Sequence, residues 1–227
     1  MFRDVCQMWI DFHTHSLFSD GELIPSELAQ RAANNGLQAV AITDHVDHSN
    51  LEQVVNDLNK VVEPLHDEIM VIVGVELSYV SPNQIAPLAK WAKQLGAQIV
   101  VVHGETIVEP GVPGTNNAAL QAEDVDLLAH PGLLTKDQVK MACNNNKFLE
   151  ITYRQGHCLT NGHVARLACD AGANLLVNTD CHSIELIDAA MAIQIAKGAG
   201  LDAEMAYKVV HENPKDVLNQ LGISLNL

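Results

Sequence analysis

Seven short apolar segments rich in β-branched residues alternate along this chain with stretches of helical composition. Such alternation is typical of parallel strands that are joined by crossover helices. Of the 227 residues, 48% are hydrophobic but only 4% are aromatic, so the core must consist mainly of Ala, Val, Leu and Ile. A core made of these aliphatic residues is typical of strands that are buried on both faces. The pattern predicts strands at residues 9–13, 39–43, 70–76, 99–103, 126–130, 148–152 and 174–179.

The segments between the strands contain residues that are typical of the first and last turns of helices. Pro25 stands near the start of the first segment, and Gly36 stands just past its end. The predicted helices are residues 25–35, 51–62, 84–95, 135–144, 162–171, 184–196, 203–211 and 214–221. Seven repeats fit an open doubly wound sheet or a closed barrel, but no G-x-G-x-x-G motif follows the first strand, which disfavours a dinucleotide-binding sheet. Without a linker or a clear internal repeat, we expect one domain over residues 1–227.

The net charge limits the kinds of molecule that the protein can bind, and the cysteine content indicates its cellular compartment. The net charge of −15 disfavours nucleic acid, because nonspecific binding to phosphate backbones needs clustered Lys and Arg. A small anionic substrate stays compatible, since metal ions can reverse the field inside a pocket. The five cysteines include no C-x-x-C pair and are expected to be reduced thiols of a cytoplasmic protein. No run of about 18 apolar residues predicts a membrane span.

Residues that bind metals follow almost every predicted strand. In parallel α/β folds the carboxyl ends of the strands meet on one face, where active sites lie. A single His at a strand end is more often an ordinary polar residue, and a single Asp or Glu there often caps the next helix. Six strand ends together favour a common site. They supply His13 and His15, Asp44 and His45, Glu76, His103, His130, and Asp180 and His182.

Two of these ends carry ligands spaced two residues apart. Side chains at positions i and i+2 of a strand point the same way, so His13 can reach one pocket with His15, and Asp180 with His182. Imidazole and carboxylate ligands suit Zn, Mn or Fe. A catalytic zinc ion takes about three protein ligands. The surplus of ligands therefore predicts a cluster of two or three divalent transition-metal ions that share a carboxylate.

The order of these motifs resembles the PHP (polymerase and histidinol phosphatase) family. The matching segments are His13-Thr-His15 followed by Asp20-Gly21, Thr43-Asp44-His45, Gly74-Val75-Glu76, His103, His130 in Ala-His-Pro-Gly, and Asp180-Cys181-His182. The resemblance implies a distorted seven-stranded (β/α) barrel of the TIM-like type and a trinuclear site. It implies that His13, His15, Glu76 and Asp180 hold one ion, that Glu76 bridges to a second ion with His103 and His130, and that Asp20, His45 and His182 hold a third.

Several other residues have expected roles. Asp180 and His182 are expected to serve catalysis as ligands of ions that activate water. Arg154 and His157, beyond the sixth strand, are candidates for binding the substrate phosphate, although an ordinary surface ion pair explains Arg154 equally well. Glu105 and Asp44 could orient ligand histidines. The loop 104–117 is either a lid or a plain connector. Cys181 should point away from the site, Glu150 has no assigned function, and the histidines expected on the surface are His48, His66, His163 and His211.

The leading hypothesis is a metal-dependent phosphoesterase that hydrolyses phosphate monoesters of small molecules, as histidinol phosphatase does. One alternative is a phosphodiesterase or nuclease that acts on nucleic-acid ends. Another is a metal-binding regulatory module without catalytic activity. A full set of bound ions without turnover would favour this last alternative. The substrate, the metal and the oligomeric state do not follow from these residues.

Overall fold

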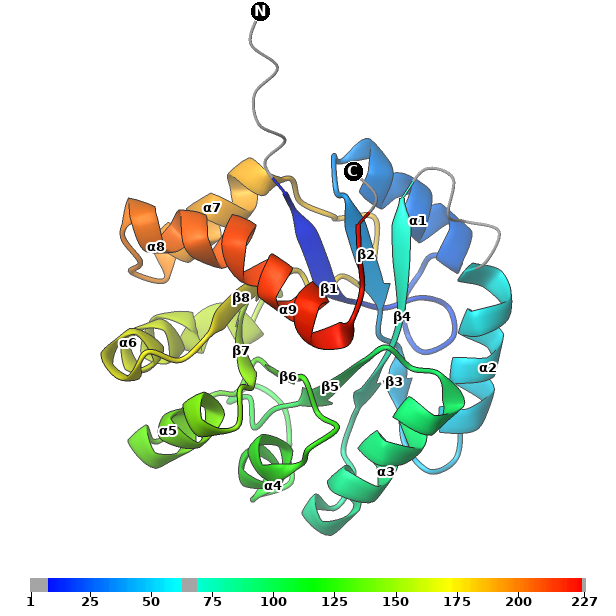
Figure 1. The fold of residues 1–227 in the computed structure, drawn as a ribbon, viewed down its shortest axis with the longest axis horizontal. Coiled ribbons are helices and arrows are strands. Elements are labelled where there is room, and N and C mark those ends of the chain that lie inside the picture. Colours follow the sequence, from blue (N-terminus) through cyan, green and yellow to red (C-terminus); the bar gives the residue numbers. More distant parts are fainter. Residues whose placement is uncertain (1–7, 63–68, 226–227) are drawn as a thin grey trace, which may run out of the picture.

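The computed structural model describes residues 8–62 and 69–225. Its centre is a sheet of parallel strands in the order β1-β2-β4-β5-β6-β7-β8, with the short β3 paired to β4 (Figure 1). The predicted barrel is confirmed. The strands are β1 (Ile10–Thr14), β2 (Ala39–Ile42), β3 (His45–Val46), β4 (Met70–Leu77), β5 (Ile99–His103), β6 (Leu127–Ala129), β7 (Phe148–Thr152) and β8 (Leu175–Asn178).

The barrel closes between β1 and the chain just beyond β8. The amide of Asp180 donates to the carbonyl of His13 at 2.9 Å, and the amide of His15 donates to the carbonyl of Cys181 at 2.8 Å. Thr14 and Cys181 form an isolated parallel bridge, so within the described residues the backbones of the two edges pair at their carboxyl ends. The backbone of residues expected to bind metal thus also closes the barrel.

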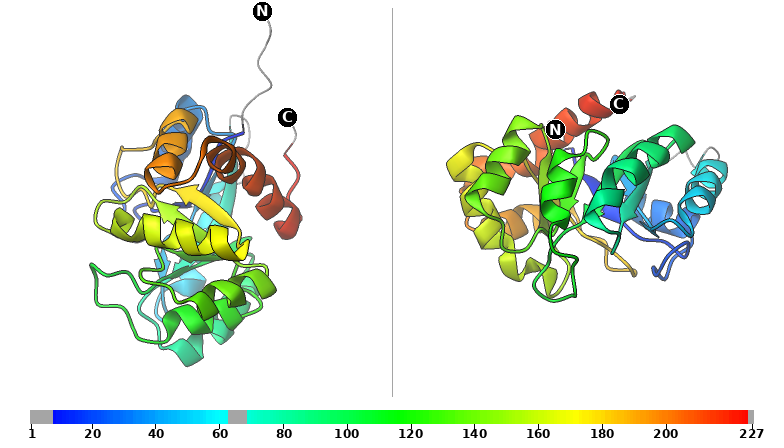
Figure 2. Two further views of the ribbon diagram at one scale, coloured as in Figure 1. Left: turned by 90° about the vertical axis from the view of Figure 1, so that its left-hand side faces the viewer. Right: turned by 90° about the horizontal axis from the view of Figure 1, so that it is seen from below.

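Helices surround the sheet and cover its outer face (Figures 1 and 2). They are α1 (Pro25–Asn34), α2 (Leu51–Val62), α3 (Pro82–Leu95), α4 (Thr115–Gln121), α5 (Lys136–Asn144), α6 (Asn161–Ala171), α7 (Ala189–Gly198), α8 (Ala203–Tyr207) and α9 (Asn213–Leu221), with a 3₁₀ turn η2 (His157–Thr160) and a π-helical turn η3 (Lys208–Glu212). None of the described helices is long and apolar enough to cross a membrane.

The buried apolar residues form two clusters, one on each side of the sheet. The larger cluster lies between strands and helices, and it includes Val40, Leu58 and Leu88. The smaller cluster fills the barrel interior with residues such as Phe12 and Ile72, and it takes in Val217 and Leu218 of α9. Helix α9 therefore covers the amino end of the barrel, and the loops at the carboxyl ends of the strands lie on the opposite side (Figure 2, right).

Two helices differ most from the prediction. Helix α4 was not predicted, and it shortens the loop expected at 104–117 to residues 104–114. Its first turn is capped from a distance, because the Glu105 carboxylate accepts from the amides of Gly114 and Asn116. Helix α7 begins at Ala189 rather than at residue 184, because the Asp188 side chain caps it by accepting from the amide of Met191.

The histidines predicted to lie on the surface differ in their actual burial. His48 is exposed, and His163 is half-buried with its Nε2 at 2.7 Å from the carbonyl of Leu134. The prediction was wrong for His211, which is buried with Nδ1 at 2.6 Å from the carbonyl of Met8. The close packing of η3 against the sheet was not visible in its sequence. His66 lies outside the described residues, as does Cys6, and the other four cysteines are free thiols.

Candidate metal centre

The predicted ligands converge at the carboxyl end of the barrel, around the buried carboxylate of Glu76. Glu76 Oε2 lies 2.8 Å from His45 Nδ1, 3.4 Å from His13 Nε2 and 3.5 Å from His15 Nε2. Its Oε1 lies 3.4 Å from His103 Nδ1 and 3.5 Å from His130 Nε2. One carboxylate from β4 is thus in contact with imidazoles from four other segments.

An irregularity in β1 directs its two histidines into this centre. Ile10 and Phe12 face the barrel interior, so strict alternation would turn His13 outward. The register between β1 and β2 shifts between Asp11 and Thr14, and such a bulge re-aims the side chains that follow it. His13 and His15 consequently lie together, with ring centroids 5.1 Å apart.

Unusual backbone conformations gather at the same place. Among the described residues only four non-glycine residues have positive φ, and three of them belong to or border the centre: Tyr79 at 56°, His130 at 25° and Asp180 at 53°. Left-handed φ values are costly for such residues and persist only where the surrounding structure imposes them. For His130 and Asp180, this conformation places the side chain of a strand-end residue into the centre.

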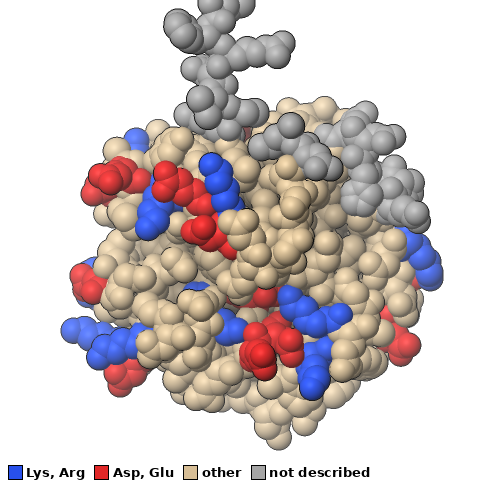
Figure 3. Space-filling model, in the orientation of Figure 1, with Lys and Arg blue, Asp and Glu red and all other residues tan. Residues whose placement is uncertain are grey.

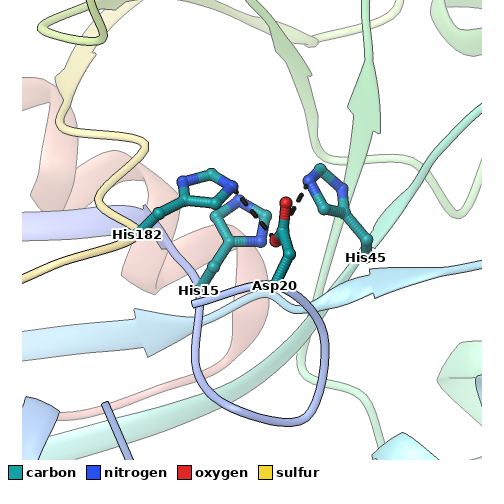
Figure 4. Close-up of side chains that lie close together, drawn as sticks. All are labelled: His15, Asp20, His45 and His182. Atoms are coloured by element: carbon teal, nitrogen blue, oxygen red, sulfur yellow. Dashed lines mark ion pairs between the residues drawn. The ribbon is translucent and has the colours of Figure 1, made fainter. Parts of the chain in front are cut away.

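One ligand group combines Asp20 with three histidines, as Figure 4 shows. Asp20 Oδ1 lies 3.2 Å from His182 Nε2 and 3.6 Å from His45 Nε2, and the rings of His15 and His182 stack with centroids 4.0 Å apart. Each side chain offers one ligand atom, and these atoms all lie within 4.8 Å of one another. This group contains the three residues of the third expected ion, with His15 added.

The loop that carries Asp20 is held by hydrogen bonds to Asp44. The Asp44 carboxylate accepts from the amide and hydroxyl of Ser16 at 2.8 and 2.6 Å, and from the hydroxyl of Ser19 at 2.6 Å. Gly21 follows Asp20, where any Cβ would collide with the carbonyl of His15. The Asp-Gly pair of the motif therefore serves the close return of this loop over β1.

Three further groups have metal-binding geometry. His13, His15 and Asp180 form one, which matches the first expected ion apart from Glu76. His45, Glu76 and His103 form another, and His13, His130 and Glu150 form the last. The expected partnership of Glu76, His103 and His130 is not one of these groups, although both histidines lie within 3.5 Å of Glu76.

Comparison with known families decides the assignment. The family described as the PHP domain matches residues 11–190, which include every predicted metal ligand. The chain belongs to the PHP family. Members of this family are metal-dependent phosphoesterases, and they bind divalent metals. An uncharacterised protein of Methanocaldococcus jannaschii is 47% identical over 218 residues, which cover 94% of this chain and 100% of that protein.

Three further proteins that are similar to this chain have names that describe different activities or assemblies. Ribonuclease P protein component 3 of Methanosarcina barkeri is 26% identical, with 92% of this chain and 88% of that protein covered. The 5′-3′ exoribonuclease Rnm of Escherichia coli is 28% identical over 71% of this chain and 48% of its own length. The solved histidinol phosphate phosphatase of Lactococcus lactis, with zinc, L-histidinol and phosphate, has a TM-score of 0.57 at 15% identity, covering 95% and 94% of the two chains.

The centre of this PHP chain fits divalent cations. Nine buried side-chain polar atoms in the described part of the chain lack a hydrogen-bond partner, and eight of them belong to Glu76, His13, His15, His103 and His130. Buried polar atoms are normally paired, so such a concentration calls for a partner. Imidazole nitrogens and carboxylate oxygens are the ligands that Zn, Mn and Fe accept.

The electrostatics of the centre point the same way. Burial opposes ionisation of Glu76, but His13 and His45 outweigh it and hold the pKa of Glu76 well below its usual range. The pKa of Asp180 is likewise lowered against its burial, chiefly by His13. Burial disfavours a charged His45, yet Glu76 raises the pKa of His45 to about 9. Glu76 and Asp180 are thus kept ionised by neighbouring protonated histidines, whose protons bound cations would displace.

Glu150 was the residue whose role the sequence did not reveal. It lies on β7 inside the barrel, fully buried, and its Oε2 is 2.8 Å from His13 Nδ1. The same carboxylate accepts from the Asn178 amide group at 2.9 Å and from the backbone amide of His130 at 3.2 Å. A buried Glu in the middle of an apolar strand was the available signal, since such a charge requires partners.

Glu105 and Asp44 do not contact ligand histidines through hydrogen bonds. Glu105 caps α4 and Asp44 holds the loop that carries Asp20, so both act on the positions of loops. The prediction that they orient imidazoles was therefore wrong. Glu150 makes such a hydrogen bond to His13, and Glu109 is in ion-pair contact with His103, with its Oε2 3.2 Å from His103 Nε2.

The two predicted substrate-binding residues lie beside the centre. Arg154 and His157 both line a small pocket over the ligands, together with Tyr79 and Glu109. Arg154 also lines an adjoining pocket of about 570 Å³. Both ring nitrogens of His157 face the loop 104–114, with Nδ1 at 2.9 Å from Thr106 Oγ1 and Nε2 at 3.3 Å from Glu109 Oε1.

Cys181 lies between the predicted ligands Asp180 and His182 in the sequence, but its thiol points to a backbone carbonyl and not into the metal centre. Its side chain is buried, and its thiol donates to the carbonyl of Ser183 at 3.0 Å. Burial raises the pKa of this thiol to about 11, so it stays protonated near neutral pH. Neither its position nor its ionisation suits a nucleophile.

Proposed function

We propose that this protein hydrolyses phosphate monoesters of small molecules at a centre of two or three divalent transition-metal ions, Zn, Mn or Fe. The observation that carries the proposal is the placement of one guanidinium, that of Arg154, beside the His and carboxylate cluster. A phosphate group held there would meet the metal centre on one side and a bidentate cationic donor on the other.

The ligand groups suggest which residues would hold the ions. His13, His15 and Asp180 would hold one ion together with Glu76, His103 and His130 would hold a second with Glu76, and Asp20, His45 and His182 would hold a third. Bound divalent ions would lower the pKa of a water molecule and offset the charge that develops on the phosphoryl group. Asp180 and His182 would contribute to catalysis through their place in this ligand set.

Arg154 is distinctive because the rest of the active face lacks cations. The loops that follow the strands at the carboxyl end, residues 15–24, 43–50, 78–81, 104–114, 130–135, 153–160 and 179–188, contain one Lys or Arg in total, which is Arg154. No ion pair of its guanidinium is formed within the described residues. One unpaired cation suffices to clamp a single phosphate group, whereas a nucleic-acid backbone requires several.

The organic part of the substrate has a place next to Arg154. The pocket of about 570 Å³ lies between the loops after β7 and β8, and its walls include Tyr153, Gln155, Ser183 and Glu185. This volume is within the range of about 300–1,000 Å³ that is usual for small-molecule sites. Its mixture of an aromatic ring, an amide, a hydroxyl and a carboxylate suits a polar small molecule.

Trimming of nucleic-acid ends is the second candidate function, and the names of two relatives favour it. Against it stands the cation-poor active face. The face of Figure 3, on the side of α9, carries acidic and basic side chains interspersed, with no continuous basic stripe in view. We therefore rank it below the monoesterase, and location in the cytoplasm stays a prediction that either function would share.

The test combines metal analysis with hydrolysis of an aryl phosphate, an aryl phosphodiester and a short 5′-labelled RNA. Wild type is compared with His13→Ala, Arg154→Ala and Arg154→Lys. We expect two to three ions per chain, preferred hydrolysis of the monoester, loss of metal and activity in His13→Ala, and a rise in KM of at least tenfold in Arg154→Ala. Preference for RNA would establish the second candidate. Full metal binding without hydrolysis of any ester would instead indicate a regulatory metal-binding module.

A further inference from the structure

The side chain of Glu109 reaches into the centre from the loop 104–114, which joins β5 to α4. Its Oε2 accepts a hydrogen bond from the Tyr79 hydroxyl at 2.6 Å and lies 3.2 Å from His103 Nε2. Its Oε1 lies 3.3 Å from His157 Nε2. One carboxylate on a surface loop therefore contacts side chains that follow three different strands.

The surroundings of His103 are similar to those of His13, except that His13 is hydrogen-bonded to its second carboxylate, whereas His103 Nε2 is in ion-pair contact with its own. Each ring has one nitrogen toward Glu76, at 3.4 Å in both cases, and the other toward a second carboxylate. For His13 that second carboxylate is Glu150, which is fully buried on β7. For His103 it is Glu109, which is 37% exposed and stands on a loop. Carboxylates in this position set the tautomer and orientation of a ligating imidazole.

Polar contacts rather than apolar burial hold the loop over the centre. Ile107 and Val108 near its tip are 52% and 44% exposed. The loop is tied inward by Thr106, whose hydroxyl meets His157 Nδ1 at 2.9 Å, and by Glu109. Tyr79, whose hydroxyl donates to Glu109, has a left-handed φ of 56° just beyond the end of β4. The backbone of Tyr79 is thus strained in the conformation that brings its hydroxyl to Glu109.

We propose that Glu109 is a positioning residue, which holds the His103 ring with Nδ1 toward Glu76 when the loop 104–114 lies over the centre. Metal occupancy at the position served by His103 is thereby linked to closure of this loop. This coupling is reciprocal. If metal binding favours the closed loop, then closure of the loop raises the affinity for the metal by the same factor. The proposal does not depend on which ester is hydrolysed.

The first test is a chelator-competition titration with Mn²⁺ and with Zn²⁺, which needs no substrate. In Glu109→Gln we expect the affinity of one ion per chain to fall by about 10–100-fold, as is usual when such a carboxylate is lost. Tyr79→Phe, which keeps the ring and removes the donor to Glu109, should weaken the same ion by a smaller factor. Glu22→Gln is the matched control, since it removes an exposed carboxylate from another loop of the same face.

The second test follows the backbone amides of residues 105–109, 111 and 112 by hydrogen exchange, with and without Mn²⁺. Metal should slow their exchange in wild type and in Glu22→Gln, but not in Glu109→Gln. Unchanged metal affinity in Glu109→Gln, an equal loss in Glu22→Gln, or metal protection of the loop that survives the removal of Glu109 would each overturn the proposal. Failure of phosphate-ester hydrolysis would leave these readouts intact, so the two proposals are tested separately.

Discussion

Glu150 Oε2 lies 2.8 Å from His13 Nδ1, and both side chains are completely buried. With Nδ1 donating to the carboxylate, His13 Nε2 is left without a hydrogen-bond partner and faces Glu76 and Asp180 at 3.4 and 3.7 Å. Glu150 on β7 thus sets which nitrogen of His13 is available as a ligand.

Glu150→Gln should weaken metal binding by about 10–100-fold, because the neutral amide is a poorer acceptor for His13 and cannot serve His130 and Asn178 equally well. Chelator competition measures this change, with Asp57→Asn on the exposed face of α2 as a control for lost charge. Wild-type affinity in Glu150→Gln would show that His13 is oriented by its other neighbours alone.

Divalent metal should raise the free energy of unfolding of the protein in addition to supporting its activity. The centre holds three ionised carboxylates and eight unpaired buried atoms, and a ligand that binds only the native state stabilises it by mass action. At a metal concentration of about 100 Kd, we expect a melting temperature roughly 5–10 °C above that of the chelated protein. Differential scanning calorimetry checks this, and His13→Ala should show a much smaller shift.

Gly21→Ala should disturb the group of Asp20, His45 and His182 without unfolding the barrel. Its new Cβ would collide with the carbonyl of His15, so the loop that carries Asp20 must move. A displacement of about 1 Å in such a site can cost about 100-fold in rate. The readouts are metal stoichiometry and kcat. Gly198→Ala, at a position with open space around it, is the control that should retain both.

Cys181→Ala should keep its metal and lose no more than a few-fold in kcat. The buried thiol remains protonated and is bonded to the Ser183 carbonyl, so its removal deletes a packing contact worth roughly 1 kcal/mol. Elemental analysis and steady-state kinetics measure the two quantities. A loss above about 100-fold with full metal content would assign the thiol a chemical role that its position does not suggest.

The order of strands and the predicted ligands could be identified from local patterns. Apolar segments such as that of β5 are short and β-branched, and each ends at a residue such as His103, so periodicity and chain order predicted both the barrel and its active end. Helix α4 escaped prediction because its cap comes from Glu105, ten residues before its first residue, Thr115. A capping side chain that is separated from its helix by a loop cannot be recognised from the local sequence.

The amino-acid sequence by itself determined the β/α alternation, the end of the barrel where the predicted metal ligands lie, and the nine side chains that gather there. Only the tertiary structure decided how those side chains are aimed. The bulge between Asp11 and Thr14, the left-handed φ of His130 and Asp180, and the carboxylates of Glu150 and Glu109 all depend on contacts between segments far apart in the chain. Strand periodicity is a local property, whereas the orientation of an imidazole is set by whatever hydrogen-bonding group the fold brings to its second nitrogen.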